Sequence, residues 1–105
     1  MTNVYIVNNS GHDFSKAEQF GKLVVLSEGL IDPYKVTGMF RKFSVAMKDS
    51  KPTDWILHSG PAVMNCIACG IFAHKHSRIN LLIWNRSHYV KRIIILKDLD
   101  NEQSS

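Results

Sequence analysis

The sequence contains little cysteine and no long apolar segment. Of its 105 residues only two are cysteines, Cys66 and Cys69, which is too few for the disulfide framework of a small secreted protein. The longest mainly apolar run, from Pro61 to Ala73, is interrupted by polar and glycine positions and is shorter than the ~20 residues that a membrane helix needs. We therefore expect a cytoplasmic protein that does not interact with membranes.

Acidic residues are missing from a long part of the chain. Between Trp55 and Lys97 there is no aspartate or glutamate, whereas the same stretch carries six lysines and arginines and four histidines. Residues 1–54 are nearly balanced in charge, and residues 98–105 form an acidic polar tail. An acid-free stretch attracts anions, such as nucleotides, nucleic acid or an acidic protein surface. A solvated basic edge that keeps a strand from aggregating is an equally good interpretation.

The sequence lacks the common motifs of nucleotide-dependent enzymes and hydrolases. It contains no Gly-x-Gly-x-x-Gly fingerprint, no Gly-x-x-x-x-Gly-Lys-Ser/Thr phosphate loop and no Gly-x-Ser-x-Gly elbow. Cys66 and Cys69 have the spacing of a redox pair but lie inside an apolar helical segment, so two buried cysteines without redox chemistry are the better interpretation. A zinc site would need His74 or His76, at spacings that do not guarantee a shared face. We expect no metal and no cofactor.

Turn signals divide the chain into short strands and helical segments. Apolar, β-branched runs predict strands at 4–8, 23–26, 55–57, 79–84 and 90–96. Helical spacing predicts one or two turns over 14–21, a helix over 34–48 that Asp32-Pro33 begins, and a helix over 61–76. Because apolar strands alternate with helices, the sheet should be mostly parallel and covered on both faces. Residues 1–97 are thus predicted to form a single three-layer Rossmann-like α/β domain, with strand order 2-1-3-4 and an antiparallel C-terminal edge strand.

Two of the predicted strands are followed by a Ser-Gly pair. Ser10-Gly11 follows the first strand, and Ser59-Gly60 follows the third. In strand order 2-1-3-4 these strands are neighbours and their connections leave on opposite faces, so their loops border the crevice in which such sheets bind ligands. Glycine lets the backbone approach a phosphate, and the helix that begins at Pro61 directs free amides to the same place. Two ordinary turns, with Ser59 serving only as a helix cap, are the alternative.

Side chains from three loops complete this predicted anion site. Imidazoles beside the Ser-Gly pairs could bind a phosphate or act as acid and base, because histidine changes charge near neutral pH. The turn after the fourth strand adds positive charge at the same edge of the sheet. The predicted ligand-binding residues are Asn9, Ser10, Gly11, His12, His58, Ser59, Gly60, Arg86 and His88. No complete catalytic motif is present, although cleavage of a phosphodiester by His12 or His58 is compatible with these residues.

The ten residues from Trp55 to Met64 read Trp-Ile-Leu-His-Ser-Gly-Pro-Ala-Val-Met, a strand, a small polar turn and the start of a helix. This segment resembles the strand-turn-helix signature of the CRISPR-associated Rossmann fold domains. The resemblance implies binding of cyclic oligonucleotides, usually by a dimer, with cleavage in some members. The family's Thr-Lys after the glycines is replaced here by Ala62-Val63, so the lysine that would contact phosphate is missing.

Two functions follow from these observations. The first is a small protein that binds a nucleotide or oligonucleotide anion at the carboxyl ends of the first and third strands. The second is a protein-interaction module without catalysis, of the kind with which a phage or mobile element captures a host factor. The short chain, a basic half that suits an acidic partner, and aromatic residues expected at the surface, such as Tyr89, favour the second. Strand 90–96 could pair across a homodimer, or Lys91, Arg92 and Lys97 could protect it from pairing.

Overall fold

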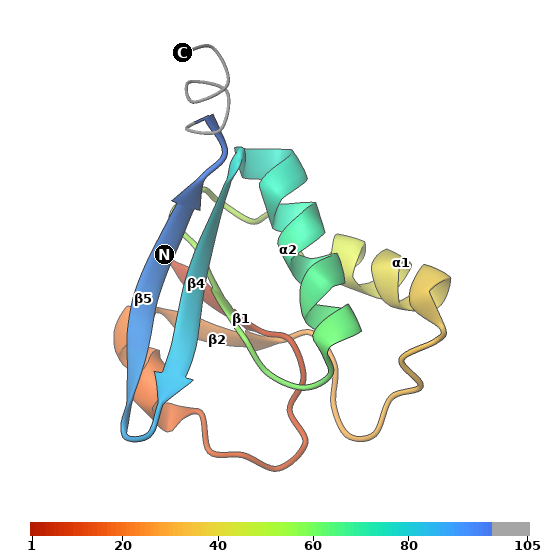
Figure 1. Cartoon of the computed structure of the whole chain (residues 1–105), viewed down its shortest axis with the longest axis horizontal. Helices are drawn as coiled ribbons and strands as arrows, with labels where there is room; N and C mark the ends of the chain where they lie inside the picture. Colours follow the sequence, from red (N-terminus) through yellow and green to blue (C-terminus); the bar gives the residue numbers. More distant parts are fainter. Residues whose placement is uncertain (98–105) are drawn as a thin grey trace.

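The computed structural model describes residues 1–97, which form five strands and three helices (Figure 1). The strands are β1 (Asn3–Ile6), β2 (Lys22–Val25), β3 (Trp55–Leu57), β4 (Arg78–Asn85) and β5 (His88–Ile95). The helices are the 3-10 helix η1 (Ser15–Phe20) and the α-helices α1 (Val36–Ala46) and α2 (Ala62–His76). All the strands and helices predicted from the sequence are present, with ends shifted by a few residues. The predicted acidic tail, residues 98–105, lies outside the described residues.

The strands form one mixed sheet in the order β2-β1-β3-β4-β5. β1 pairs in parallel with β2 and β3, β3 pairs in parallel with β4, and β4 and β5 form an antiparallel hairpin. The predicted order 2-1-3-4 and the antiparallel edge strand are therefore confirmed. The reversal between β4 and β5 is a two-residue turn, Arg86-Ser87, and Arg86 has the positive φ, 58°, that tight hairpin turns favour.

Helices cover the two faces of the sheet unequally. Because side chains alternate along a strand, Tyr5 faces α1 and α2, whereas Val4 and Ile6 face η1. The cluster beneath the two α-helices includes the fully buried Phe43 and Phe72. Figure 1 shows α1 and α2 together on one side of the strands, with the short η1 behind the β4-β5 hairpin. The three-layer architecture is thus confirmed, and one of its outer layers is a single 3-10 helix.

Helix α1 begins later than its sequence signals predict. Asp32-Pro33 was expected to start the helix, but its first residue is Val36 and it has no side-chain cap. The Asp32 carboxylate accepts a hydrogen bond from the Tyr34 backbone N–H at 2.9 Å, and the Asp32 carbonyl accepts one from the Lys35 N–H at 3.3 Å. Asp32 therefore stabilises a turn before the helix rather than the helix itself.

Helix α2 turns its two cysteines away from the centre of the core. It buries Met64, Ala68 and Phe72 against the sheet, while Cys66 is exposed and Cys69 is half-buried. The expectation of two buried cysteines is therefore wrong for Cys66. Burial raises the pKa of the Cys69 thiol, the opposite of what a redox pair needs. None of the helices in the described part of the chain has the length and apolar composition to cross a bilayer.

Phe43 and Phe40 provide a matched test of the core, since they lie three residues apart on α1. Phe43 is 0% exposed and Phe40 is 53% exposed. We expect Phe43→Ala to lower the free energy of unfolding by about 3–5 kcal/mol, because it leaves a cavity, and Phe40→Ala to lower it by less than about 1 kcal/mol. Denaturant unfolding followed by tryptophan fluorescence measures both. Similar losses in the two variants would contradict this packing of α1.

Candidate functional site

Hydrogen bonds tie together the carboxyl ends of β1, β2 and β3. The Asn8 backbone N–H donates to the Ser59 hydroxyl oxygen at 3.1 Å, and this hydroxyl donates to the Leu57 carbonyl at 3.3 Å. The Asn8 side-chain amide donates to the Ser27 hydroxyl oxygen at 3.0 Å and to the Gly29 carbonyl at 3.1 Å. The Ser59 hydroxyl, predicted to face a ligand, therefore directs its proton to the protein's own backbone.

Asn65, near the start of α2, holds the loop that connects β3 to this helix. Its side-chain oxygen accepts a hydrogen bond from the Ser59 N–H at 3.1 Å, and its amide donates to the Ser59 carbonyl at 2.8 Å and to the Pro61 carbonyl at 3.0 Å. The N-cap position is Pro61, which makes no side-chain capping bond. The alternative that Ser59 caps the helix is therefore wrong, and Asn65 fixes the loop from inside the helix.

Gly60 brings the loop after β3 against β1. Its φ is +75°, and a Cβ atom at this position would lie 2.5 Å from the Asn8 Cβ. The close approach fills the gap between the ends of the two strands with protein atoms, so this glycine serves packing. The other predicted pair differs, because the Gly11 N–H donates to the Asn9 side-chain oxygen at 3.1 Å in an exposed turn. Only the pair after β3 is therefore part of the junction between β1 and β3.

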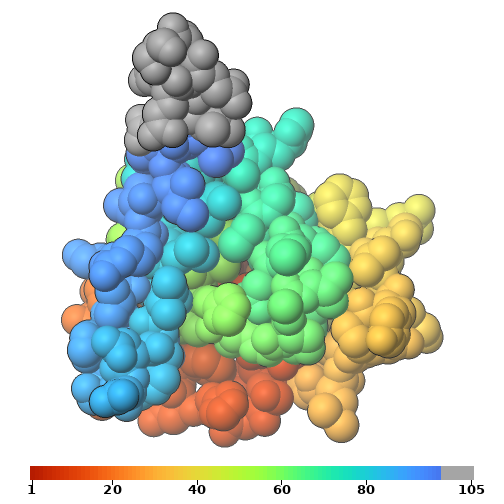
Figure 2. All heavy atoms as spheres, in the orientation of Figure 1, coloured from red at the N-terminus to blue at the C-terminus, as the bar shows by residue number. Residues whose placement is uncertain are grey.

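A pocket of about 330 Å³ lies beside this junction. It lies on the η1 side of the sheet, since its apolar lining belongs to the core cluster on that side. In Figure 2 the surface is hollowed where the blue hairpin, the red loop after β1 and the green start of α2 meet. The lining residues are His12, Asp13, Phe14, Leu57, His58, Ser59, Gly60, Trp84 and Tyr89.

The pocket contains some of the predicted binding residues and not others. It brings together His12, His58, Ser59 and Gly60 from the loops after β1 and β3. It does not include Asn9, Ser10, Gly11, Arg86 or His88, although these lie in the adjoining loops and hairpin turn. The pocket thus includes the predicted residues of the loop after β3 and excludes the Ser-Gly pair after β1 and the predicted residues of the hairpin turn.

Trp84 and Tyr89 form an aromatic wall that the sequence analysis did not identify. Their ring centroids are 4.9 Å apart in an edge-to-face arrangement. Trp84 is 47% exposed, whereas Tyr89 is only 8% exposed, so the expectation of Tyr89 at the surface is wrong. The two residues are direct partners in the β4-β5 register. This pairing could have been found from the short turn, because a two-residue hairpin loop fixes which residues lie opposite each other.

Asp13 is the one acidic side chain among the residues that line this pocket. Its carboxylate accepts a hydrogen bond from the Ser15 N–H at 2.9 Å, and this bond lowers the pKa of Asp13, which is ionised at neutral pH. Burial, together with the nearby Asp13 charge, raises the pKa of the Tyr89 phenol, which therefore stays protonated. The pocket thus offers both a negatively charged acceptor and aromatic surface.

His12 and His58 are exposed, and the His12 ring packs edge-to-face against Phe14 with centroids 6.3 Å apart. Within residues 1–97 the side chains of His76 and His88 take part in hydrogen bonds, whereas those of His12 and His58 take part in none. A general base normally needs such a partner to orient its ring. The same residues contain no group of three or more histidine, cysteine, aspartate and glutamate side chains that could hold a metal ion. The His12 and His58 side chains thus have no hydrogen-bond partner among residues 1–97 and line the pocket.

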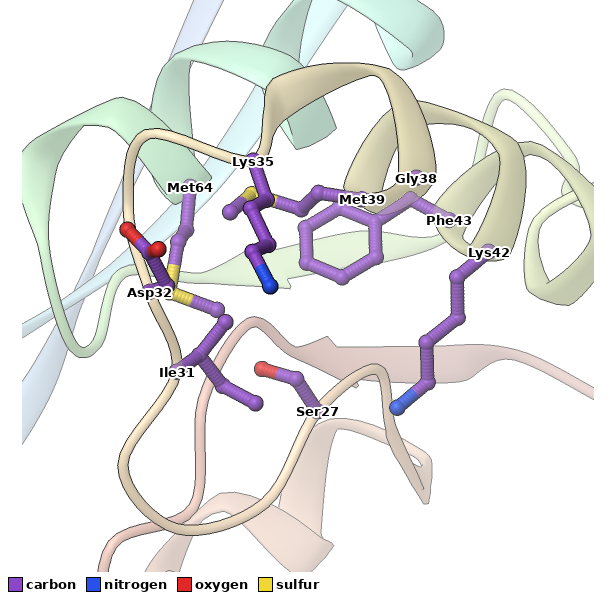
Figure 3. Close-up of a pocket in the computed structure, with 9 residues that line it drawn as sticks. All are labelled: Ser27, Ile31, Asp32, Lys35, Gly38, Met39, Lys42, Phe43 and Met64. Carbon is purple, nitrogen blue, oxygen red and sulfur yellow. The ribbon is translucent and has the colours of Figure 1, made fainter.

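A smaller pocket, of about 200 Å³, lies on the other side of the sheet. Figure 3 shows Lys35, the residue before α1, and Lys42, within α1, beside a floor that includes Phe43 and Met64. The Ser27 hydroxyl at its edge already donates to the Val7 carbonyl at 2.6 Å. The pocket therefore has an apolar floor and a rim of mixed charge, because Asp32 lines it together with the two lysines, and the Ser27 hydroxyl is occupied.

Alanine substitutions at Gly60 and Gly29 distinguish the cost of a left-handed backbone conformation from the cost of a steric clash. Both have φ near +75° (+75° and +73°), but a Cβ at Gly29 would meet nothing within 4 Å. We expect Gly29→Ala to lower the free energy of unfolding by about 1–2 kcal/mol, the cost of the left-handed conformation. Gly60→Ala should lower it by about 1–3 kcal/mol more, because the methyl group overlaps Asn8. Denaturant unfolding measures both variants, and equal losses of unfolding free energy would show that Gly60 does not pack against Asn8.

The comparison with protein families gives a match that covers every strand and helix at least in part. A family model described as phage Pam3 gp32-like protein matches residues 2–93, from the start of β1 into β5. Comparison with curated proteins and with solved structures finds no match. The expectation of a phage-type protein is confirmed at the level of the family: the chain belongs to the phage Pam3 gp32-like protein family.

Proposed function

We propose that the protein binds a nucleotide, or one nucleotide unit of an oligonucleotide, in the pocket beside the β1-β3 junction. The observation that carries the proposal is the convergence of Trp84, His12 and His58 around a volume of about 330 Å³. A nucleotide combines a flat aromatic base with an anionic phosphate. An exposed indole suits the base, and imidazoles suit the phosphate.

The residues around the pocket make one of its ends suitable for the base and the other suitable for the phosphate. At the hairpin end the Lys16 ammonium lies 5.6 Å from the centroid of the Trp84 ring and donates to the Ser87 carbonyl at 3.1 Å, which fixes a cation beside the indole. At the other end α2 begins at Ala62, two positions after the pocket residue Gly60, so the positive end of the helix dipole favours a phosphate there.

Asp13 limits which nucleotide groups can lie next to it. An ionised carboxylate repels phosphate but accepts hydrogen bonds from hydroxyl or amino groups, as acidic residues do from ribose in other α/β sheets. A sugar hydroxyl or a base amino group therefore suits the position beside Asp13, and the phosphate suits the side nearer His58. The proposal is binding without a required cleavage step, since no hydrogen bond within residues 1–97 orients either imidazole as a general base.

Trp84 provides the most direct test of this proposal. Mononucleotides and short single-stranded oligonucleotides should quench tryptophan emission at low salt, and Trp84→Ala should weaken binding by roughly 5- to 150-fold, because one stacked base is worth about 1–3 kcal/mol. Tyr34→Ala, which removes an aromatic ring exposed outside the pocket, should bind as the wild type does. Titration calorimetry measures the affinities of all three proteins.

Two histidines serve as a second matched pair in the same titration. His58→Ala removes an imidazole that lines the pocket, whereas His88→Ala removes an exposed one that does not. Only the first should weaken nucleotide binding. If no nucleotide or oligonucleotide binds the wild type at low salt, or if Trp84→Ala binds as tightly as the wild type, the proposed function is wrong.

A groove between α1 and α2 supports a second candidate function, the capture of a protein partner. The groove has a volume of about 580 Å³ and an apolar floor that includes Phe40, Ile67 and Ile71. Lys48 and Lys75 line its rim, and none of the residues within 1–97 that line it is acidic. Such a surface fits the apolar face of an acidic amphipathic helix, the mode in which many proteins bind helical segments in grooves.

Designed peptides test the groove separately from the pocket. A helical peptide with leucines on one face and glutamates on the other should bind, and its lysine counterpart should not, because the rim is basic. Phe40→Ala, expected to fold normally, should weaken binding of the acidic peptide. Fluorescence anisotropy of the labelled peptides gives the affinities. Equal binding of the two peptides, or unchanged binding to Phe40→Ala, would exclude this partner.

A further inference from the structure

Strand β5 is a long sheet edge with no neighbour on its outer side within residues 1–97. It has eight residues, twice as many as β2 at the opposite edge, which has four. Its register with β4 runs without interruption from His88 to Ile95, so there is neither a bulge nor a proline in it. Natural proteins usually protect such edges, because their free N–H and C=O groups pair readily with another strand.

The hairpin geometry shows which backbone groups of β5 are free. In an antiparallel pair, residues whose N–H and C=O bond to the partner strand alternate with residues whose groups point away. The Leu96 N–H donates to the Ser77 carbonyl at 3.2 Å, so even-numbered residues face β4. The outward-facing residues are therefore Tyr89, Lys91, Ile93 and Ile95.

An independent contact agrees with this assignment. The Arg92 guanidinium donates to the Lys91 carbonyl at 2.8 Å, as expected for a carbonyl that lies on the free edge. The Lys91 ammonium lies 6.0 Å from the centroid of the Phe20 ring, so this side chain extends over η1 and not along the edge. The Lys91 side chain thus leaves the edge, whereas the Arg92 guanidinium covers the Lys91 carbonyl, which a pairing strand would have to take from it.

Exposed isoleucines lie on both faces of this edge. Ile93 is 50% exposed and Ile94 is 48% exposed, and as neighbours in a strand they point to opposite sides of the sheet. A protein that packs against one face would cover only one of them. A strand added to the edge would cover part of both and would also bond the free backbone groups.

We propose that two copies of the chain pair through antiparallel β5 strands around a two-fold axis at Ile93. A symmetric antiparallel pair places one residue opposite its own copy, and this residue faces either outward or towards β4. Axes at Lys91 and at Arg92 would set two like charges directly opposite each other, and an axis at Ile94 would set Lys91 opposite Lys97, which is destabilising. An axis at Ile93 sets Lys91 opposite Ile95 and Arg92 opposite Ile94, so no like charges face each other.

The axis at Ile93 also keeps the middle of β5 in register. Residues 91–95 of the two copies pair with one another, whereas an axis at Ile95 would leave Ile95 as the only residue of β5 that pairs with β5 of the other copy. The two five-stranded sheets then form one continuous sheet. In the pair the Lys91 carbonyl accepts the Ile95 N–H of the other copy in place of the Arg92 guanidinium.

Cysteine cross-linking tests this register directly. In a background with Cys66→Ser and Cys69→Ser, Ile93→Cys should form a disulfide-linked dimer on mild oxidation, because directly opposed bonded residues have Cα atoms ~5.5 Å apart, within disulfide range. Ile94→Cys is the matched control, with similar exposure in the single chain. It lies opposite Arg92 in the pair, too far from its own copy, and should link much less.

The oligomeric state provides the second measurement. Light scattering during size exclusion should give about twice the 11.9 kDa of one chain for the wild type, and one chain for Ile93→Lys, which sets two lysines face to face. Circular dichroism checks that this variant folds. A monomeric wild type, a dimer that persists in Ile93→Lys, or equal cross-linking of Ile93→Cys and Ile94→Cys would overturn the proposal.

Discussion

The contact between Asn8 and the Ser59-Gly60 pair is the constraint on which the rest of this structure depends. The connections that follow the parallel strands β1 and β3 leave on opposite faces of the sheet. The ends of two such strands border a crevice unless side chains fill it. Here the backbone N–H of Asn8 bonds to the Ser59 hydroxyl, and Gly60 lies against the Asn8 side chain. Asn65 then fixes the same loop from α2.

Because that junction is filled, the pocket of this protein lies to one side of it. The η1 layer is a single 3-10 helix, too small to cover the whole face of the sheet. The hairpin therefore keeps Trp84 half exposed beside the loop histidines, and the pocket opens between them. A full-length helix in place of η1 would cover this surface, so the thin layer is what makes the proposed nucleotide site accessible.

This small protein has three surfaces for which binding is proposed. Residues 2–93 match a phage family, and every strand of the sheet lies at least partly in that range. The pocket lies on the η1 side, the apolar groove lies between α1 and α2, and β5 contributes Tyr89 to the pocket. Binding a ligand, a helix and a second copy are physically compatible, because Tyr89 lies outside residues 91–95, which pair in the proposed dimer.

The sequence by itself determined the α/β class and the positions of the loops after β1 and β3, because apolar runs and turn residues are local signals. It also determined the strand order, because crossover connections between parallel strands have one preferred hand. It also indicated His12, His58, Ser59 and Gly60 near one another. Only the tertiary structure decided that Ser59 bonds to Asn8, that Tyr89 is buried, and that Asp13 and Trp84 line the same pocket. These facts depend on contacts between residues far apart in the chain, and no local pattern encodes such contacts.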